Sequence, residues 1–324
     1  MSKVKMSDLG EVGPLLGCAL GDSYGSGFEF VPDGKIRARN DLSGYLQHQK
    51  WKALKPGLYT DDTQMSMGLV EHILANDPWR LPVLADRWVK TFKRDPHAGY
   101  SGGFYQLLKE VNSGMQLMAR IRPDSDKNGG AMRAWPCGLE ADTRTVRDLA
   151  MRQAALTHCT AEGMAAAAAA ALMFHHRYYD LGTLPTLPYF IGQWVPGFGF
   201  GESVWQGSVS TSGIDTVKAA MTALMQGDTL ADVVQRAVAF GGDTDTVAAI
   251  AATSAAVCRE TRNVYPKVLL DRLENGKYGK DYIRDLDAKI LTDFPRPAAD
   301  PIPDTGSEDT DEDGDWFDRL FGED

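Results

Sequence analysis

Features that would place a protein outside the cell or in a membrane are scarce in this sequence. It has four cysteines in 324 residues, far apart and with no CxxC pair, which argues against a disulfide framework or a zinc site. No basic and then apolar leader opens the chain, and the longest apolar run, residues 164–174, is too short to span a bilayer. We therefore expect a cytoplasmic protein with no membrane partner, in which these cysteines are reduced core thiols: Cys18, Cys137, Cys159 and Cys258.

A surplus of charge of either sign is also absent from most of the chain. The formal net charge is −10, but residues 303–324 contain ten acidic residues and one arginine, so the rest of the chain has 33 basic and 34 acidic residues. A body so close to neutral has no broad basic surface, and we do not expect nucleic acid as a partner.

The acidic end of the chain has the composition of a disordered tail, which we place at residues 299–324. Asp309, Asp311 and Asp313 match the start of an EF-hand loop, but Leu320 stands where such a loop needs a bidentate glutamate. A solvated tail fits better than a calcium site. Such a tail could bind a basic protein partner or only aid solubility.

Strand signals are scarce, whereas apolar residues recur at helical spacing along most of residues 1–298. Many short helices without a heptad pattern predict a single compact all-α domain. Irregular structure is expected at residues 31–58, 122–130 and 182–213, where glycine, proline and polar residues gather. The predicted helices cover residues 12–24, 62–74, 84–92, 104–118, 145–156, 161–175, 215–225, 230–240, 246–259 and 265–290.

Two short clusters of aspartate and threonine, residues 60–63 and 243–246, each precede a predicted helix. Helix capping is the simpler interpretation of either cluster alone. Capping does not need two aspartates and two threonines, however, and if the clusters meet, each close carboxylate pair costs about 4 kcal/mol at an effective dielectric of roughly 20. Divalent ions would remove that cost, and oxygen-only ligands favour Mg²⁺, Mn²⁺ or Ca²⁺ over Zn²⁺.

Two glycine-rich segments between these clusters could contact a ligand. Residues 97–103 form a Gly/Ser loop before a predicted helix, where backbone N–H groups suit a phosphate or diphosphate; the alternative is a flexible connector. Residues 127–133 form a tight turn whose Asn128 and Arg133 could reach a sugar or a phosphate.

Three single residues have a functional and a structural interpretation. Asp22 fits a hydrogen-bonding residue at a helix end. Glu29 is either a surface side chain or one that swings over a site. His158, between two predicted helices, is either a ligand contact or a structural hydrogen bonder.

In their order along the chain, these segments resemble the ADP-ribosylglycohydrolases, a family that includes the dinitrogenase reductase-activating glycohydrolases, the ADP-ribosylhydrolases and the J1 crystallins. Each segment alone is a weak signal, but six in this order within residues 11–260 are specific. They are Gly21-Asp22 with Glu29, Thr60-Asp61-Asp62-Thr63, Gly99-Tyr100, Asn128-Gly129-Gly130-Ala131-Met132-Arg133, Leu156-Thr157-His158 and Gly241-Gly242-Asp243-Thr244-Asp245-Thr246.

The resemblance implies an all-helical domain with two Mg²⁺ or Mn²⁺ ions in a central cleft. By resemblance, the metal ligands are Thr60, Asp61, Asp62, Asp243, Asp245 and Thr246. The diphosphate would be lined by Gly99, Tyr100, Ser101 and Gly102, and ADP-ribose would be contacted by Asn128, Gly129, Met132 and His158. The adenine-stacking aromatic residue of some members has no clear counterpart in residues 119–127.

The resemblance also suggests the catalytic groups. By resemblance, Asp61 would be a catalytic residue, and one of two other carboxylates would act with it. Glu29 matches a mobile glutamate that covers the metals in some members, and Asp95 matches an acid/base position in bacterial enzymes of the arginine type. Which of the two acts is open.

A metal-dependent hydrolase that releases ADP-ribose from protein side chains is the activity that the resemblance implies. An arginine linkage is favoured over a serine linkage because Asp95 suits the arginine-type enzymes. An ADP-ribosylated protein would be the partner and ADP-ribose the product. Two other classes stay open: a non-catalytic ADP-ribose-binding or crystallin-like scaffold, and a metal-dependent phosphoesterase that acts on ADP-ribose.

Overall fold

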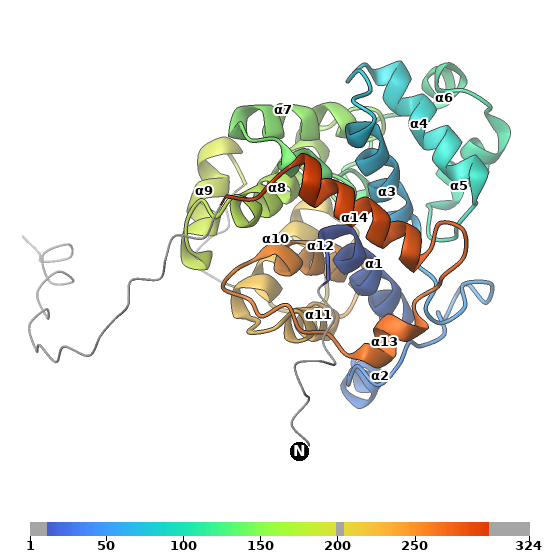
Figure 1. Ribbon diagram of the computed structural model, residues 1–324. Helices are drawn as coiled ribbons and strands as arrows, with labels where there is room; N and C mark the ends of the chain where they lie inside the picture. Colours follow the sequence, from blue (N-terminus) through green and yellow to red (C-terminus); the bar gives the residue numbers. More distant parts are fainter. Residues whose placement is uncertain (1–11, 199–203, 298–324) are drawn as a thin grey trace, which may run out of the picture.

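The computed structural model describes residues 12–198 and 204–297, and every regular element within these ranges is helical (Figure 1). The predicted all-α class is therefore confirmed. None of the helices in these ranges combines the length and apolar character needed to cross a membrane. The division into a domain of residues 1–298 and an acidic tail stays a prediction, because the tail lies outside the described residues.

The α-helices are α1 (Pro14–Gly25), α2 (Asp33–Arg39), α3 (Asp61–Leu74), α4 (Leu81–Arg94), α5 (Gly102–Glu110), α6 (Gly114–Arg120), α7 (Thr143–Ala154), α8 (Ala161–Tyr178), α9 (Leu187–Trp194), α10 (Gly213–Gln226), α11 (Leu230–Ala239), α12 (Thr244–Val257), α13 (Lys267–Arg272) and α14 (Lys280–Asp293). Short 3₁₀ turns lie at η2 (Ser26–Phe28), η3 (Asn128–Gly130), η4 (Trp135–Leu139) and η5 (Leu184–Thr186).

Several predicted boundaries were wrong. The helix predicted at 104–118 is two helices, α5 and α6, because the backbone is extended at Val111 and Ser113 caps a new helix by accepting the N–H of Gln116. The section predicted at 265–290 divides into α13 and α14 for a similar reason, since Gly276 and Gly279 lie between them. The segments expected to be irregular contain α2 and α9.

Three of the cysteines lie in the core as expected, but Cys159 is exposed. It occupies the turn before α8, where its backbone N–H donates to the carbonyl of Pro123 (2.6 Å) and Thr160 caps the helix. The turn is held by its backbone, so the Cys159 side chain is not needed in the core.

Two helices whose residues are all buried, α1 and α12, form the centre of the domain. They run antiparallel and very close together, because glycine recurs every four residues along α1 at Gly17, Gly21 and Gly25. A Cβ atom at Gly21 would lie 2.3 Å from the carbonyl oxygen of Ala248 in α12, far inside contact distance. Only glycine allows this approach, which brings the end of α1 to the start of α12.

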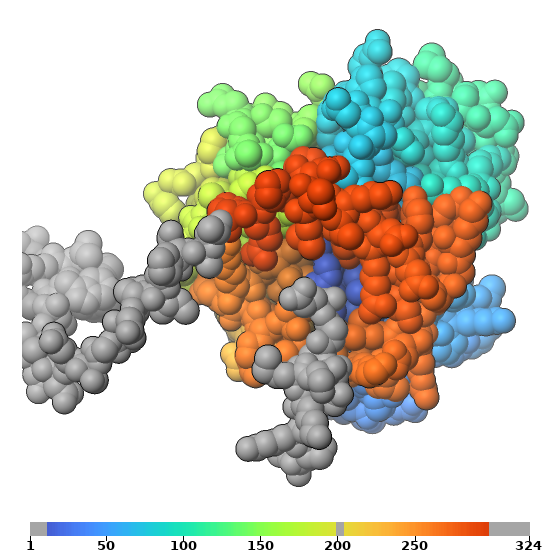
Figure 2. Space-filling model, in the orientation of Figure 1, coloured from blue at the N-terminus to red at the C-terminus, as the bar shows by residue number. Residues whose placement is uncertain are grey.

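The other helices enclose this pair. The alanine run at residues 165–171 in α8 presents small side chains, and α7, α10 and α12 pack against this helix. α3 and α14 pack against α1. Figure 2 shows α14 spread across one face of the molecule, with only a small area of α1 visible beside it. The starts of α3 and α12 and the end of α1 consequently meet in the interior.

The substitution Gly21→Ala tests the close contact between α1 and α12. We expect it to lower the free energy of unfolding by about 3 kcal/mol or more, because the added methyl group has no room against the backbone of α12. Gly192→Ala is the matched control: nothing lies within 4 Å of a Cβ at Gly192 in α9, so alanine should stabilise that helix by about 0.5–1 kcal/mol. Urea unfolding measures both. A Gly21→Ala protein as stable as wild type would contradict this packing.

Candidate active site

The two acidic clusters lie together at the starts of α3 and α12, beside the end of α1. One carboxylate oxygen from each of Asp22, Asp62 and Asp245 lies within 4.8 Å of the others, and the same holds for Glu29, Asp243 and Asp245. The two carboxylate triads therefore share Asp245. Every member except Glu29 is buried.

Asp22, in the last turn of α1, holds the start of α3 in place. Its carboxylate accepts hydrogen bonds from the backbone N–H and hydroxyl of Thr60 (both 2.8 Å) and from the backbone N–H and hydroxyl of Thr63 (3.1 and 2.6 Å). Negative charge at a helix N-terminus also interacts favourably with the helix dipole. The hydrogen-bonding interpretation of Asp22 is thus confirmed, and these bonds join α1 to the first acidic cluster.

Helix capping does not explain the second acidic cluster. Asp243 occupies the N-cap position of α12, yet its side chain makes no capping hydrogen bond, whereas Thr60 does cap α3. A tight turn presents Asp243: Gly241 and Gly242 have φ angles of 75° and 81°, and the N–H of Asp243 donates to the carbonyl of Val209 (3.0 Å). The carboxylate of Asp243 is therefore available to the site.

Burial and mutual repulsion raise the pKa values of these carboxyl groups. Loss of hydration raises the pKa of Asp62 well above its usual range, and the negative charges of Asp22 and Asp61 raise it further. Asp245 shifts in the same direction, through burial first and then through Glu29 and other carboxylates. The fold thus disfavours the ionised cluster unless positive charge joins it.

The donor set fits a hard divalent cation. The Oδ1 atom of Asp62 is buried and has no hydrogen-bond partner among the described residues, a costly state for a charged oxygen. The surrounding donors are carboxylate and hydroxyl oxygens, which Mg²⁺, Mn²⁺ and Ca²⁺ prefer. A bound cation would be coordinated by the unpartnered oxygen of Asp62 and would also offset the repulsion among the carboxylates.

The two candidate acid/base carboxylates lie in different surroundings. Glu29 belongs to one carboxylate triad, and its side chain is only 18% exposed, so it is not a solvated surface group. Asp95 follows the end of α4, belongs to neither triad and has a side chain that is 44% exposed. Its carboxylate lies 3.2 Å from Nε2 of His97. Of the two, Glu29 is the carboxylate that the structure places in the cluster.

The glycine loop at residues 97–103 packs against the start of α3. Gly99 has a φ of 113°, and a Cβ atom there would lie 2.1 Å from Oδ1 of Asp61. Tyr100 points into the core, where its hydroxyl donates to Gln64 (2.7 Å), so only its backbone can face a ligand. The next two residues are exposed at the N-terminus of α5.

The η3 turn joins the second acidic cluster to His158. The Asn128 side chain donates to Oδ2 of Asp243 (3.1 Å). A Cβ atom at Gly129 would lie 3.1 Å from Cε1 of His158. Burial lowers the pKa of His158 to about 3, and the positive charge of Arg133 adds to the effect, so the imidazole is neutral. Met132, after this turn, is buried.

The expectation that Arg133 could reach a sugar or a phosphate is wrong. Its guanidinium is buried, lies 4.1 Å from the ring centre of Trp88, and donates to Gln153 (2.8 Å) and Thr157 (2.7 Å). A third hydrogen bond, to the carbonyl of Gly129 (2.6 Å), ties the η3 turn to the histidine segment. Its hydrogen-bond partner Thr157 lies 24 positions away in sequence and Trp88 lies in α4, so no local pattern identifies these contacts.

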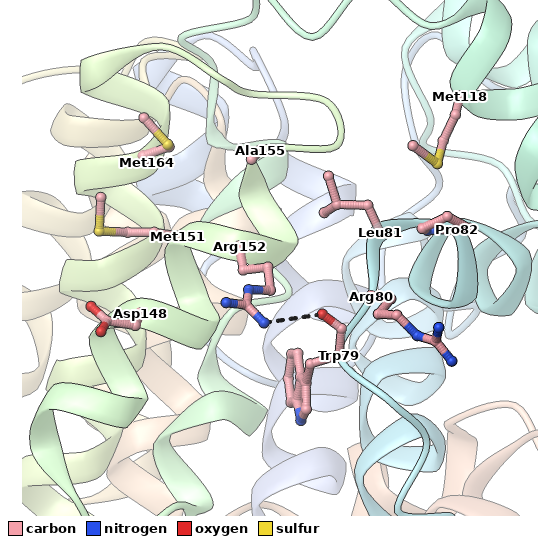
Figure 3. A pocket seen from close by; sticks show the side chains of 10 residues that line it. All are labelled: Trp79, Arg80, Leu81, Pro82, Met118, Asp148, Met151, Arg152, Ala155 and Met164. Atoms are coloured by element: carbon pink, nitrogen blue, oxygen red, sulfur yellow. Dashed lines mark hydrogen bonds between the residues drawn. The ribbon is translucent and has the colours of Figure 1, made fainter.

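A separate cavity of about 650 Å³ lies between α4 and α7 (Figure 3). Its lining is mostly apolar and includes Trp79, Met118 and Met164. Arg152 lies beside it and donates to the backbone carbonyl of Trp79 (3.3 Å). None of the lining residues, all in the described part of the chain, belongs to the acidic clusters or the glycine loop. The titratable groups with perturbed pKa values mark the acidic site, not this cavity, as the candidate centre.

Fold and site together define an all-helical protein with a buried oxygen-donor centre. Residues 12–299 match the family described as ADP-ribosylglycohydrolase. The chain therefore belongs to the ADP-ribosylglycohydrolase family, as the resemblance implied. A solved structure titled "ADP-ribosylglycohydrolase-related protein complex" supports the fold, with a TM-score of 0.64 at 22% identity over 89% of this chain and 98% of that one.

Curated relatives include enzymes of different named specificity. The chain is 25% identical over 278 residues to "ADP-ribosylarginine hydrolase Tri1" of Serratia proteamaculans, covering 81% of this chain and 74% of the relative. It is 25% identical over 284 residues to the "ADP-ribosyl-[dinitrogen reductase] glycohydrolase" of Rhodospirillum rubrum, covering 86% and 95%. It is 32% identical to human "ADP-ribosylhydrolase ARH3" over 181 residues, which are 50% of this chain and 48% of that protein.

Removal of divalent cations should make stability depend on pH in a defined direction. Because the folded-state pKa values of Asp61, Asp62 and Asp245 are raised, their contribution to stability is complete below about pH 4 and is lost as the pH rises through the folded-state values. In a chelator, Tm should therefore fall as the pH rises above about 4, and Mn²⁺ should reduce that fall.

Substitution of two cluster aspartates distinguishes the contribution of the cluster to the slope of Tm against pH from that of other groups. Asp62→Asn with Asp245→Asn should reduce the slope of Tm against pH in chelator. The slope that is left is due to Asp61, whose pKa is also raised, and to Glu274 and Asp287, whose pKa values burial raises to about 7. Asp148→Asn on the surface should keep the wild-type slope. A wild-type slope that neither Mn²⁺ nor the double substitution alters would contradict this electrostatic account.

Proposed function

We propose that the protein is a hydrolase that removes ADP-ribose from modified protein side chains and that works with two divalent cations, Mg²⁺ or Mn²⁺. Family membership supports the substrate class. The observation that carries the metal dependence is the unpartnered, buried Oδ1 atom of Asp62 in the middle of carboxylate and hydroxyl donors. A scaffold protein has no need for such a costly arrangement.

The acidic clusters would hold the cations. The proposed ligands are Thr60, Asp61, Asp62, Asp243, Asp245 and Thr246. When bound, such ions supply Lewis-acid chemistry, which orients the ribose hydroxyls and makes a water molecule more acidic. Asp22 would keep the α3 ligands in place through its bonds to Thr60 and Thr63.

Glu29 is the better placed of the two candidate carboxylates to move a proton. It would accept a proton from the attacking water, whose oxygen bonds to the anomeric carbon as the bond from that carbon to the protein side chain breaks. The electron pair of the broken bond leaves with the side chain, which takes up a proton. Asp95, paired with His97 outside the triads, would act only on the leaving group.

The rest of ADP-ribose would lie over the glycine loop and the η3 turn. Backbone groups of Gly99, Tyr100, Ser101 and Gly102 would line the diphosphate. Asn128, Gly129, Met132 and His158 would contact the nucleotide, with His158 acting as a neutral hydrogen-bonding group because its pKa is lowered to about 3. Gly99 is the strictest of these positions, since any Cβ atom would collide with Asp61.

An arginine linkage is the favoured substrate. The relatives named for arginine and for dinitrogen reductase align with 81% and 86% of this chain, whereas the ARH3 relative aligns with 50%. A cytoplasmic setting and a basic partner for the acidic tail remain proposals from composition.

Peptides with ADP-ribose on arginine, serine or glutamate test the proposal directly. With Mn²⁺ or Mg²⁺ we expect release of intact ADP-ribose, fastest from arginine, and no release in chelator. Mass spectrometry of the product distinguishes the rival functions. AMP would indicate a phosphoesterase, and tight binding without release would indicate a scaffold. Faster release from serine would contradict the preferred linkage but not the activity.

The variant Asp245→Ala should lose this hydrolysis to the limit of detection, because Asp245 belongs to both carboxylate triads. Its helical circular dichroism should be unchanged, and its Tm in chelator should be no lower than that of wild type, since a repelling buried carboxylate is gone. Asp148→Ala, a surface aspartate, serves as the control with normal turnover. Normal hydrolysis by a folded Asp245→Ala protein would refute the assigned role.

A further inference from the structure

His48 makes a hydrogen bond whose direction the surrounding backbone determines. The ring is buried, with Nε2 2.5 Å from Oε2 of Glu29. Its other nitrogen, Nδ1, accepts the backbone N–H groups of Lys50 and Trp51, each at 3.0 Å. Because Nδ1 receives two donors, it carries no hydrogen, and the single ring hydrogen is on Nε2. His48 therefore donates to Glu29 through its Nε2–H.

A hydrogen-bond donor stabilises the carboxylate of Glu29, which lies next to other carboxylates. One of its oxygens is within 4.8 Å of oxygens of Asp243 and Asp245, and carboxylates that close repel one another. Among the described residues, His48 is the only group that donates a hydrogen bond to the Glu29 carboxylate. The backbone N–H of Phe30 also donates to the carbonyl of Gly242 (2.8 Å), which ties the chain beside Glu29 to the turn before α12.

The loop around His48 is itself held by short-range contacts. The ring stacks on Trp51 with centroids 4.9 Å apart and an interplanar angle of 13°. The Gln47 side chain donates to the carbonyl of Leu54 (2.7 Å) and so bridges the loop, and its hydrogen bonds do not involve Glu29. The imidazole thus has a defined position before any ligand binds.

We propose that His48 is a positioning residue: its Nε2–H holds Oε2 of Glu29 at the edge of the acidic cluster and leaves Oε1 free to accept a proton. The kinetic effect of His48 rests on the proposed function, whereas the hydrogen bond between His48 and Glu29 does not. The histidine acts through Glu29 and takes no part in the bond changes.

A double-mutant cycle tests the kinetic consequence. His48→Ala should lower kcat by about 10–100-fold with little change in KM, as for other groups that orient a reacting side chain. His48→Gln should recover part of the loss, since its amide can donate from near the Nε2 position. In a Glu29→Gln background, His48→Ala should cost nothing further, because there is no carboxylate left to hold.

Gln47→Ala is the matched control, since it loosens the same loop and should leave kcat within about twofold of wild type. An equal loss of kcat from Gln47→Ala, or a full extra loss from His48→Ala in the Glu29→Gln background, would show a merely structural role and overturn the proposal.

A second experiment measures the tautomer of His48 and requires neither bound metal nor catalytic activity. Long-range ¹H–¹⁵N NMR of the histidine rings, with His48 assigned by its absence in His48→Gln, should show the Nε2–H tautomer at neutral pH. Its proton should move upfield in Glu29→Ala. A ring protonated on Nδ1 would overturn the proposal. A wild-type protein without hydrolase activity would refute the proposed function, while this measurement would still decide whether His48 holds Glu29.

Discussion

Repulsion among buried carboxylates is the constraint on which this structure depends. Asp62, Asp243 and Asp245 are all nearly inaccessible to water, and their pKa values are raised because the fold removes their hydration and places them together. Such a cluster opposes folding in its ionised form. A fold that keeps it must gain something from it, and binding of hard cations is the gain that the donor chemistry supports.

The contact between α1 and α12 is what makes the cluster possible. Gly17, Gly21 and Gly25 let the two helices approach until their backbones touch, which places the end of one at the start of the other. Asp22 then draws the start of α3 to the same point through four hydrogen bonds. Three segments distant in sequence thus meet through backbone geometry and one buried carboxylate, so glycine at these positions matters as much as the acidic residues themselves.

Local patterns in the sequence predicted much of the fold and part of the site. Apolar periodicity located α3, α8 and α12, and the density of aspartate and threonine marked both acidic clusters. The break between α5 and α6 was missed because Val111 and Asn112 are ordinary residues, and the interruption depends on Ser113 starting a new helix.

Long-range partners account for what the sequence could not reveal. In the sequence Arg133 has the character of a ligand-binding residue, but in the structure its side chain is bound by Trp88, Gln153 and Thr157. His48 lies in a segment without regular pattern, and its role follows only from its distance to Glu29. The different surroundings of Glu29 and Asp95 likewise do not follow from the sequence, since only Glu29 belongs to a carboxylate triad.

The central claim is that hard cations replace protons in the buried cluster. Calorimetric titration of the metal-free protein with Mn²⁺, repeated in two buffers of different ionisation enthalpy, measures this exchange most directly. The account predicts saturable binding accompanied by proton release, because binding ionises carboxyl groups whose pKa values the fold has raised, and it predicts loss of both in Asp62→Asn. Absence of saturable binding, or binding without release of protons, would contradict it.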